Sequence, residues 1–339
     1  MKKFLTCVLT IALVGGCVFA GGGKESGSKR IKIGVALASQ AQYRFKFDQK
    51  IMENKAAELG ADIIFQYANY DATKQANQVE NLISQGIDVL ILNVVSGNMV
   101  NLVEKVRKEG IPVITFDNTV EGAQVELNVD RDNVKVGQLQ LQSAIDFIGP
   151  KGGNVVLVKG DPGSAVAQRI SKGYDMVAAK NANIKIVANQ FHEAWSPEKA
   201  LKTVENALSA NHDNIQAFVC SADSVAMGIV PAIKAAKLDG KTFLCGMDVE
   251  VSAAKLINQG VMTMSIWTDI ISGDQRTVEA AVKLAKGEKL VPDEIQKIGG
   301  FDIPVLLVDV VPITKDNLRK WLKEIAPEGW ATEAEIFGN

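Results

Sequence analysis

Histidine and cysteine are scarce in this chain, and their scarcity argues against a transition-metal site. The sequence has 2 histidines and 4 cysteines, and Cys7 and Cys17 belong to the extreme N-terminus. No Cys/His cluster has the spacing of a transition-metal site, so we expect no bound metal. The other two cysteines, Cys220 and Cys245, follow apolar runs, where they form either a disulfide or, as buried cysteines commonly do, small hydrophobic side chains.

Several enzyme motifs are also missing from the sequence. There is no Gly-x-Ser-x-Gly elbow, no Gly-x-x-x-x-Gly-Lys phosphate loop and no His-Glu-x-x-His motif. Lysine and arginine (37) nearly balance aspartate and glutamate (39), so electrostatics give no reason to expect nucleic-acid binding. We expect a protein that is not an enzyme, requires no cofactor and binds no nucleic acid.

The N-terminal apolar run is too short to span a membrane. It covers residues 4–16 after Lys2 and Lys3, about thirteen residues against the ~20 that a spanning helix needs, and has the length of a signal-peptide core. It ends in Val-Gly-Gly-Cys17, which resembles a bacterial lipobox with Cys17 as the lipidated residue. Ordinary cleavage after Ala20 is the alternative. We interpret 1–17 as a lipoprotein signal segment and 18–30 as a flexible Gly/Ser tether, which predicts an extracytoplasmic protein anchored by lipid.

About 310 residues follow, enough for two domains with cores of their own. Short β-branched runs, such as 31–35, 62–65 and 89–92, alternate with helical patterns that glycine ends at Gly60 and Gly86. The series restarts after residue 150. We therefore predict an α/β fold with two doubly wound, mostly parallel sheets.

Ligands of open α/β sheets lie beyond the carboxyl ends of the strands, so the residues placed there are candidates. They combine carboxylates, an arginine and amides, which bond to hydroxyl pairs, with aromatic rings, which pack on the apolar face of a sugar. The candidate ligand-binding residues are Gln42, Arg44, Phe45, Asp117, Asn118, Ser164, Gln168, Trp195, Asp223, Asp248 and Trp267.

Each candidate also has a simpler interpretation. Asp223 and Asp248 each precede a helical pattern and could be N-caps, while Trp195 and Trp267 could be core or rim aromatics. Arg44 could be a solvated surface charge. A pair of carboxylates could also serve a glycosidase, although aspartates on separate domains suit clamping better.

From about residue 31 to 313 the chain resembles periplasmic sugar-binding proteins of the ribose, galactose and xylose type, and the xylose type most closely. The stretches that carry the resemblance are KIGVA (32–36), QVENLISQGIDVL (78–90), DNVKVG (132–137) and WSPEKAL (195–201).

The resemblance implies a clamp with three hinge crossings. Its lobes would be 31–121 plus 269–292 and 122–268 plus 293–325, with 326–339 as a C-terminal tail. By the same resemblance, Arg44, Phe45, Asp117, Trp195 and Asp248 match site positions of the family, and Asp223 matches the aspartate of an Asn-Asp pair.

Some positions depart from the family pattern. Asn118 replaces an arginine, Ala222 an asparagine and Thr268 a lysine, while Ala165 and Val166 replace amides. The loss of these donors suits fewer hydroxyls, or a ligand such as an amine that brings its own donors.

The resemblance implies a monomeric binding protein that carries a monosaccharide to the permease of an ABC importer. The alternatives are a sensor for a chemotaxis or kinase receptor, and a binder of an amine or nucleoside. A transcription regulator of the same fold is disfavoured by the signal segment and by the lack of a helix-turn-helix pattern before Ile31.

Overall fold

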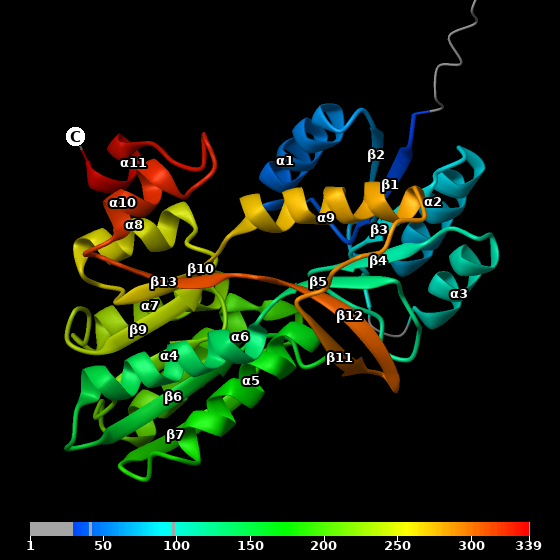
Figure 1. The fold of residues 1–339 in the computed structure, drawn as a ribbon. Helices are drawn as coiled ribbons and strands as arrows, with labels where there is room; N and C mark the ends of the chain where they lie inside the picture. Colours follow the sequence, from blue (N-terminus) through cyan, green and yellow to red (C-terminus); the bar gives the residue numbers. More distant parts are fainter. Residues whose placement is uncertain (1–29, 41–42, 97–98, 339) are drawn as a thin grey trace, which may run out of the picture. The chain divides into compact units, whose positions relative to one another are not determined.

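The computed structural model, which describes residues 30–40, 43–96 and 99–338, contains two separate β-sheets, each flanked by helices (Figure 1). The first sheet has the strand order β11-β12-β5-β4-β3-β1-β2, and the second has the order β13-β10-β9-β8-β6-β7. We call each sheet with its helices a lobe. Every strand pair is parallel except β11 with β12 and β10 with β13. The predicted α/β class with two doubly wound sheets is confirmed.

Helices cover both faces of the first sheet, because its central strands are apolar on both faces. Ile33 and Val35 of β1 pack with α1 and α9, whereas Ala36 packs on the opposite face with α2 and α3. The strands are β1 (Lys32–Leu37), β2 (Asp62–Tyr67), β3 (Val89–Leu92), β4 (Val113–Phe116), β5 (Leu127–Arg131), β11 (Glu294–Ile298) and β12 (Phe301–Val308). The helices are α1 (Phe45–Glu58), α2 (Ala72–Ser84), α3 (Val100–Lys108) and α9 (Ile270–Ala285).

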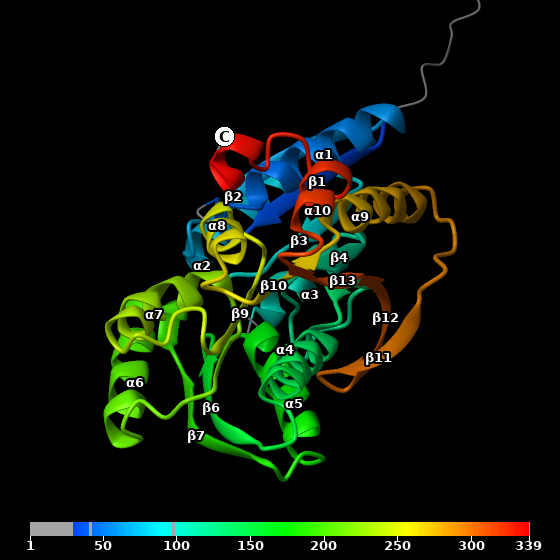
Figure 2. The same ribbon diagram turned by 90° about the vertical axis from the view of Figure 1, so that its left-hand side faces the viewer.

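The second lobe repeats this arrangement, with α4 and α5 on one side of the sheet and α6 and α7 on the other (Figure 2). Val155 and Leu157 of β6 face α4 and α5, and Val156 and Val158 face α6 and α7. The strands are β6 (Gly153–Lys159), β7 (Ile184–Phe191), β8 (Ala217–Cys220), β9 (Phe243–Met247), β10 (Met264–Thr268) and β13 (Val310–Thr314). The helices are α4 (Asn133–Ile148), α5 (Ala165–Ala178), α6 (Pro197–Ala210), α7 (Asp223–Ala235), α8 (Val251–Gln259), α10 (Leu318–Glu324) and α11 (Glu333–Phe337), with a 3₁₀ turn at Glu193–Trp195.

The chain passes between the sheets three times, after β5, after β10 and after β12. Two of these crossings are joined by a hydrogen bond of 2.9 Å from Asp269 N to Asp309 O. The predicted lobe boundaries place residues 122–131 and 293–308 in the second lobe, and for these two segments they are wrong. Strand pairing places β5, β11 and β12 in the first sheet, where β12 lies between β5 and the edge strand β11.

The segment expected to be a C-terminal tail is instead folded. Its helix α11 packs against α8, and Trp330 is buried. The structure also settles the two strand cysteines: Cys220 and Cys245 are buried free thiols on the neighbouring strands β8 and β9.

Candidate functional site

A cleft of about 770 Å³ lies between the carboxyl ends of the two sheets. Residues of the first lobe line one side: Ala38, Tyr43, Arg44, Phe45, Tyr70, Asn93, Val94, Val95, Ser96, Asp117, Asn118 and Arg131. The other side and the C-terminal segment contribute Asp161, Gly163, Ser164, Val166, Ala194, Trp195, Ala222, Ser224, Met247, Asp248, Glu250 and Trp330. The cleft therefore lies where ligands of open α/β sheets are found.

Alternating charges form the floor of the cleft. Asp117 Oδ1 forms an ion pair with Arg44 Nη1 at 3.2 Å and a second one with Arg131 Nη2. The other terminal nitrogen of Arg131 donates to Asp248 Oδ1 at 3.1 Å and to Thr268 Oγ1 at 3.2 Å. Because Arg131 ends β5 and Asp248 follows β9, this guanidinium links the two lobes through the floor of the cleft.

The charges of the floor stabilise one another. Burial alone would raise the pKa of Asp117, but the adjacent Arg131 and Arg44 guanidinium groups hold it below its ordinary value. Asp117 is therefore an ionised acceptor at neutral pH. Arg131 Nε is buried without a hydrogen-bond partner, and the exposed fractions of the Asp117 and Asp248 side chains are 15% and 28%, so both carboxylates reach the cleft.

Both carboxylates stand on unusual backbone. The φ angles of Asp117 and Asp248 are 62° and 103°, in the left-handed region that non-glycine residues seldom adopt. Hydrogen bonds hold each turn in place: Asp117 N donates to Val129 O and Asp248 N donates to Ile266 O, both at 2.8 Å. Strained residues of this kind concentrate at binding sites, where the surrounding structure fixes the side chain in one direction.

Asp223 supports the turn that carries Asp248. Its carboxylate accepts from Ser265 Oγ and from Glu250 N, both at 2.8 Å, and Ser265 Oγ in turn accepts from Val249 N at 3.0 Å. Burial first, and then the nearby charge of Asp248, raises the pKa of Asp223 well above its ordinary value. Asp223 therefore fixes the backbone beside the site and does not face the ligand space.

Aromatic rings close the cleft on both sides. Phe45 lies under the Arg44 guanidinium, whose carbon is 5.3 Å from the ring centre. Trp195 lies against Gly160, where an added Cβ would come within 2.2 Å of the indole. A glycine at position 160 is thus needed for the indole to approach the strand end, and the two rings offer apolar surface next to the charged floor.

The structure brings together most of the predicted site residues. Arg44, Phe45, Asp117, Asn118, Ser164, Trp195 and Asp248 line the cleft, whereas Gln42 lies outside the described residues. Asn118 and Ser164 also have structural bonds: Asn118 Nδ2 donates to Val94 O at 2.9 Å, and Ser164 caps α5. The simpler interpretation of Asp248 as a helix cap does not hold, since Glu250 is the N-cap of α8.

Three predicted residues do not line the cleft. Gln168 is exposed and donates to Pro162 O at 2.7 Å, so its amide points to the neighbouring turn. Asp223 is fully buried, and Trp267 is only 1% exposed in an aromatic cluster with Trp321 and Trp330. All three residues are near a strand end in sequence, which is why they were predicted to bind ligand, but their side chains point away from the cleft.

The residue that sequence reasoning missed is Arg131. The arginine expected after Asp117 is replaced by Asn118, which suggested a lost guanidinium, but Arg131 brings one to the same carboxylate from β5. Its signal was the Asp-Arg-Asp sequence at 130–132, which was not recognised because polar residues interrupt the apolar pattern of β5. Tyr43, Glu250 and Trp330 were also not assigned to the site.

Other kinds of site are not indicated within the described residues. No group of three or more histidine, cysteine, aspartate or glutamate side chains there is arranged to hold a metal ion. Within the same part of the chain, no helix combines the length and the apolar character needed to cross a membrane.

Two lobes with a charged cleft between the carboxyl ends of their sheets are the architecture of a binding clamp. Residues 33–289 match the periplasmic binding protein domain, and the chain belongs to this family. The fold is the type I form, as its structural neighbours show.

Two curated relatives cover nearly the whole chain. The D-xylose-binding periplasmic protein of Haemophilus influenzae is 34% identical over 314 residues, covering 91% of this chain and 93% of the relative. The protein of the same name from Escherichia coli is 33% identical, with the same shares covered. An ABC transporter solute-binding protein of Clostridium phytofermentans, solved with bound β-D-glucose, superposes with a TM-score of 0.79 over 90% of this chain and 99% of that one. At 24% identity this last match concerns the fold alone.

Proposed function

We propose that this chain captures a monosaccharide, with D-xylose as the first candidate, and delivers it to the permease of an ABC importer. The observation that carries the proposal is the cleft floor, where Asp117, Arg131, Arg44 and Asp248 alternate acceptors and donors. Hydroxyl pairs of a sugar match such a row, because each hydroxyl both donates and accepts. Phe45 and Trp195 provide apolar surface for the C–H face of a ring.

The arginine on β5 favours a sugar over an amine. The loss of donors at several family positions had left room for a ligand that brings its own donors. Arg131 supplies guanidinium N–H groups beside Asp117, so the floor already has both kinds of partner for neutral hydroxyls. The names of the two xylose-binding relatives support a pentose.

Transport follows from closure of the clamp. A ligand that contacts both lobes stabilises the closed state, and the closed surface is then what a permease recognises. We propose that the protein acts outside the cytoplasm as a monomer, without catalytic activity, and is held at the membrane by lipid on Cys17. Cys17 and residues 18–29 of the tether lie outside the described residues, and the lipobox pattern alone supports this anchor.

A binding panel tests the ligand class. Thermal unfolding and calorimetric titration would compare D-xylose, D-ribose, D-allose, D-glucose, xylitol, glucosamine and adenosine. We expect one neutral sugar to stabilise the protein by about 2.7 kcal/mol at a concentration of about 100 times its Kd. Stabilisation by glucosamine or adenosine alone would replace the sugar by an amine or nucleoside, and no response to any compound would reject the proposal.

A further inference from the structure

The C-terminal segment, residues 326–338, is built into the second lobe. Asn258 Nδ2 on α8 donates to Ile336 O at 3.1 Å, and Thr332 begins α11 with a capping box that includes Glu335. Between these elements and α10 lies Trp330, which is 1% exposed and lines the cleft. This segment therefore places an indole beside the ligand space from the very end of the fold.

Trp330 also contacts the first lobe. Its ring centre is 5.0 Å from that of Tyr43, edge to face, and 4.8 Å from that of Phe47. Tyr43 Oη donates to Trp330 O, and Phe47 lies in the apolar cluster formed mainly by the second lobe. Since Phe47 lies in the first turn of α1 and Tyr43 lies just before that helix, one residue of the C-terminal segment contacts both lobes beside the cleft.

The same indole fixes the backbone next to Asp248. Trp330 Nε1 donates to Val249 O at 3.0 Å, in a buried hydrogen bond. The φ angle of Val249 is 49°, a strained value for a β-branched residue, and the strained Asp248 precedes it. The Val249 carbonyl faces Trp330 while its N–H faces Ser265, so the turn is held from both sides.

We propose that Trp330 is a positioning residue of the binding site: it orients the Asp248 turn and joins α1 to the second lobe, so that the C-terminal segment contributes to ligand affinity. The inference rests on the proposed function, because affinity has to be measured with a sugar. It assigns a role in binding to a segment that follows the last strand of the second sheet.

Trp321 provides a matched control. It belongs to the same aromatic cluster, with its ring centre 5.3 Å from that of Trp267, and it is fully buried. Trp321 Nε1 has no hydrogen-bond partner, so Trp321→Phe removes ring volume without removing a hydrogen bond. Trp330→Phe removes comparable volume together with the bond to Val249, while keeping an aromatic ring against α1.

Calorimetric titration with D-xylose, paired with thermal unfolding, gives the first test. We expect Trp330→Phe to weaken binding by about tenfold, as the loss of one buried hydrogen bond and part of the ring packing predicts. Trp321→Phe should lower the melting temperature similarly and leave the Kd within about twofold of wild type. Equal Kd values for the two variants would overturn the proposal.

Hydrogen–deuterium exchange of the ligand-free protein gives a test that needs no sugar. In Trp330→Phe, exchange of peptides containing residues 43–47 and 248–250 should increase, and in Trp321→Phe it should match wild type. Unchanged exchange at both sites in Trp330→Phe would also overturn the proposal. If wild-type protein bound no D-xylose, the ligand assignment would fail, whereas the exchange result would still decide the role of Trp330.

Discussion

Single side chains in the cleft floor have several partners each, and this sharing determines what a substitution does. Asp117 neutralises two guanidinium groups, and Arg131 links Asp117 with Asp248 and Thr268. A sugar hydroxyl that enters this row meets donors and acceptors whose directions are already set. The row is therefore preorganised, which reduces the ordering cost of binding.

Asp117→Asn should weaken sugar binding by about 100-fold or more, because a neutral amide replaces the carboxylate shared by Arg44 and Arg131. The free energy of unfolding should fall by about 1–3 kcal/mol, since Arg44 keeps Asp48 and Arg131 keeps Asp248. Calorimetric titration with D-xylose and urea denaturation measure the two effects. Gln168→Ala is the control, as Gln168 lies outside the cleft; a Kd unchanged by Asp117→Asn would remove Asp117 from the site.

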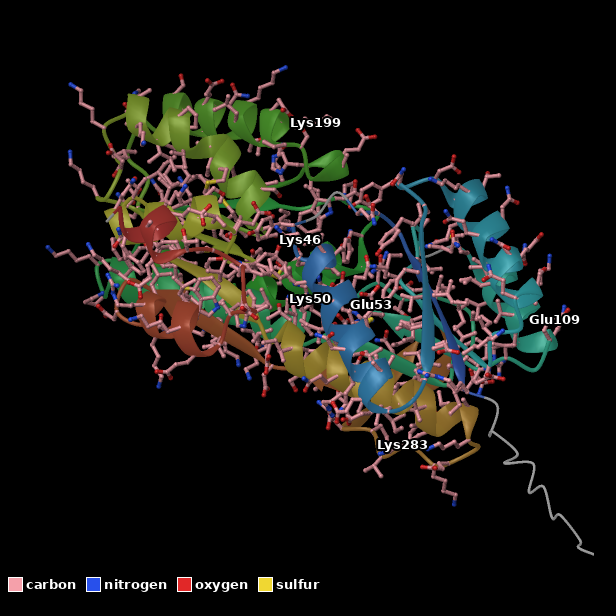
Figure 3. All side chains as sticks on the ribbon, turned by 90° about the horizontal axis from the view of Figure 1, so that it is seen from above. Lys46, Lys50, Glu53, Glu109, Lys199 and Lys283 are labelled. Carbon is pink, nitrogen blue, oxygen red and sulfur yellow. The ribbon has the colours of Figure 1, made fainter. Side chains whose placement is uncertain are left out.

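Between elements, the contact of α1 with α9 contains two buried acids. The two helices lie beside each other in Figure 3, where Lys46, Lys50 and Glu53 mark α1 and Lys283 marks α9. Asp48 of α1 and Asp274 of α9 interact through their side chains, and Arg44 Nε contacts Asp48 at 3.2 Å. Burial raises the pKa of Asp48 to about 6, against the opposing charge of Arg44. Burial first, and then the charge of Asp48, raises the pKa of Asp274 well above its ordinary value. The pair therefore holds a proton that the unfolded chain releases near pH 4.

This pair should make the protein less stable as pH rises. Both acids bind protons more tightly when folded, so their contribution is complete below pH 4 and is lost as pH rises through about 6 and above. Asp274→Asn removes one acid and should flatten the dependence of unfolding free energy between pH 5 and 8 by on the order of 1–3 kcal/mol. Urea denaturation at the two pH values measures it, with the exposed Asp302→Asn as control. An unchanged slope in Asp274→Asn would show that the pair is not the source.

The strands that sequence patterns predict are those that contain a run of β-branched and other apolar residues. The runs 31–35, 62–65 and 89–92 correspond to β1, β2 and β3, and Gly60 and Gly86 mark the helix ends between them. β5 and β11 were missed because charged residues interrupt their apolar patterns, and their absence shifted the lobe boundaries. Pairing partners far apart in sequence, such as β5 and β12, decide which lobe a strand joins, and local patterns contain no such information.

Candidate site residues were likewise predicted where their strand was recognised and missed where it was not. The rule that ligands lie beyond strand ends found Asp117, Asp248 and Trp195, because those strands were recognised. It missed Arg131, whose strand was not recognised, and it added Asp223, whose side chain turns inward to Ser265. Side-chain direction depends on tertiary hydrogen bonds that no sequence window contains.

At the scale of the whole molecule, Arg131 connects the cleft with two of the chain crossings that form the hinge. Arg131 terminates β5 directly before the first crossing, and its guanidinium reaches Thr268 directly before the second. A ligand that shares Asp117 and Asp248 with Arg131 thus acts on the hinge as well as on the lobes. We therefore expect occupancy of the cleft to bias the angle between the lobes.

Delivery to a permease also depends on where the molecule is held, and that is a property of the whole chain. If Cys17 receives lipid, wild-type protein expressed in a bacterial host should incorporate labelled palmitate and sediment with membranes. Cys17→Ser should abolish the label, because the thiol that accepts the lipid is gone. Cys7→Ser should keep the label, since the lipobox interpretation places residue 7 within the signal segment that is cleaved off. A mature N-terminus at Gly21, found by N-terminal sequencing of the wild type, would instead establish ordinary secretion and leave the clamp without an anchor.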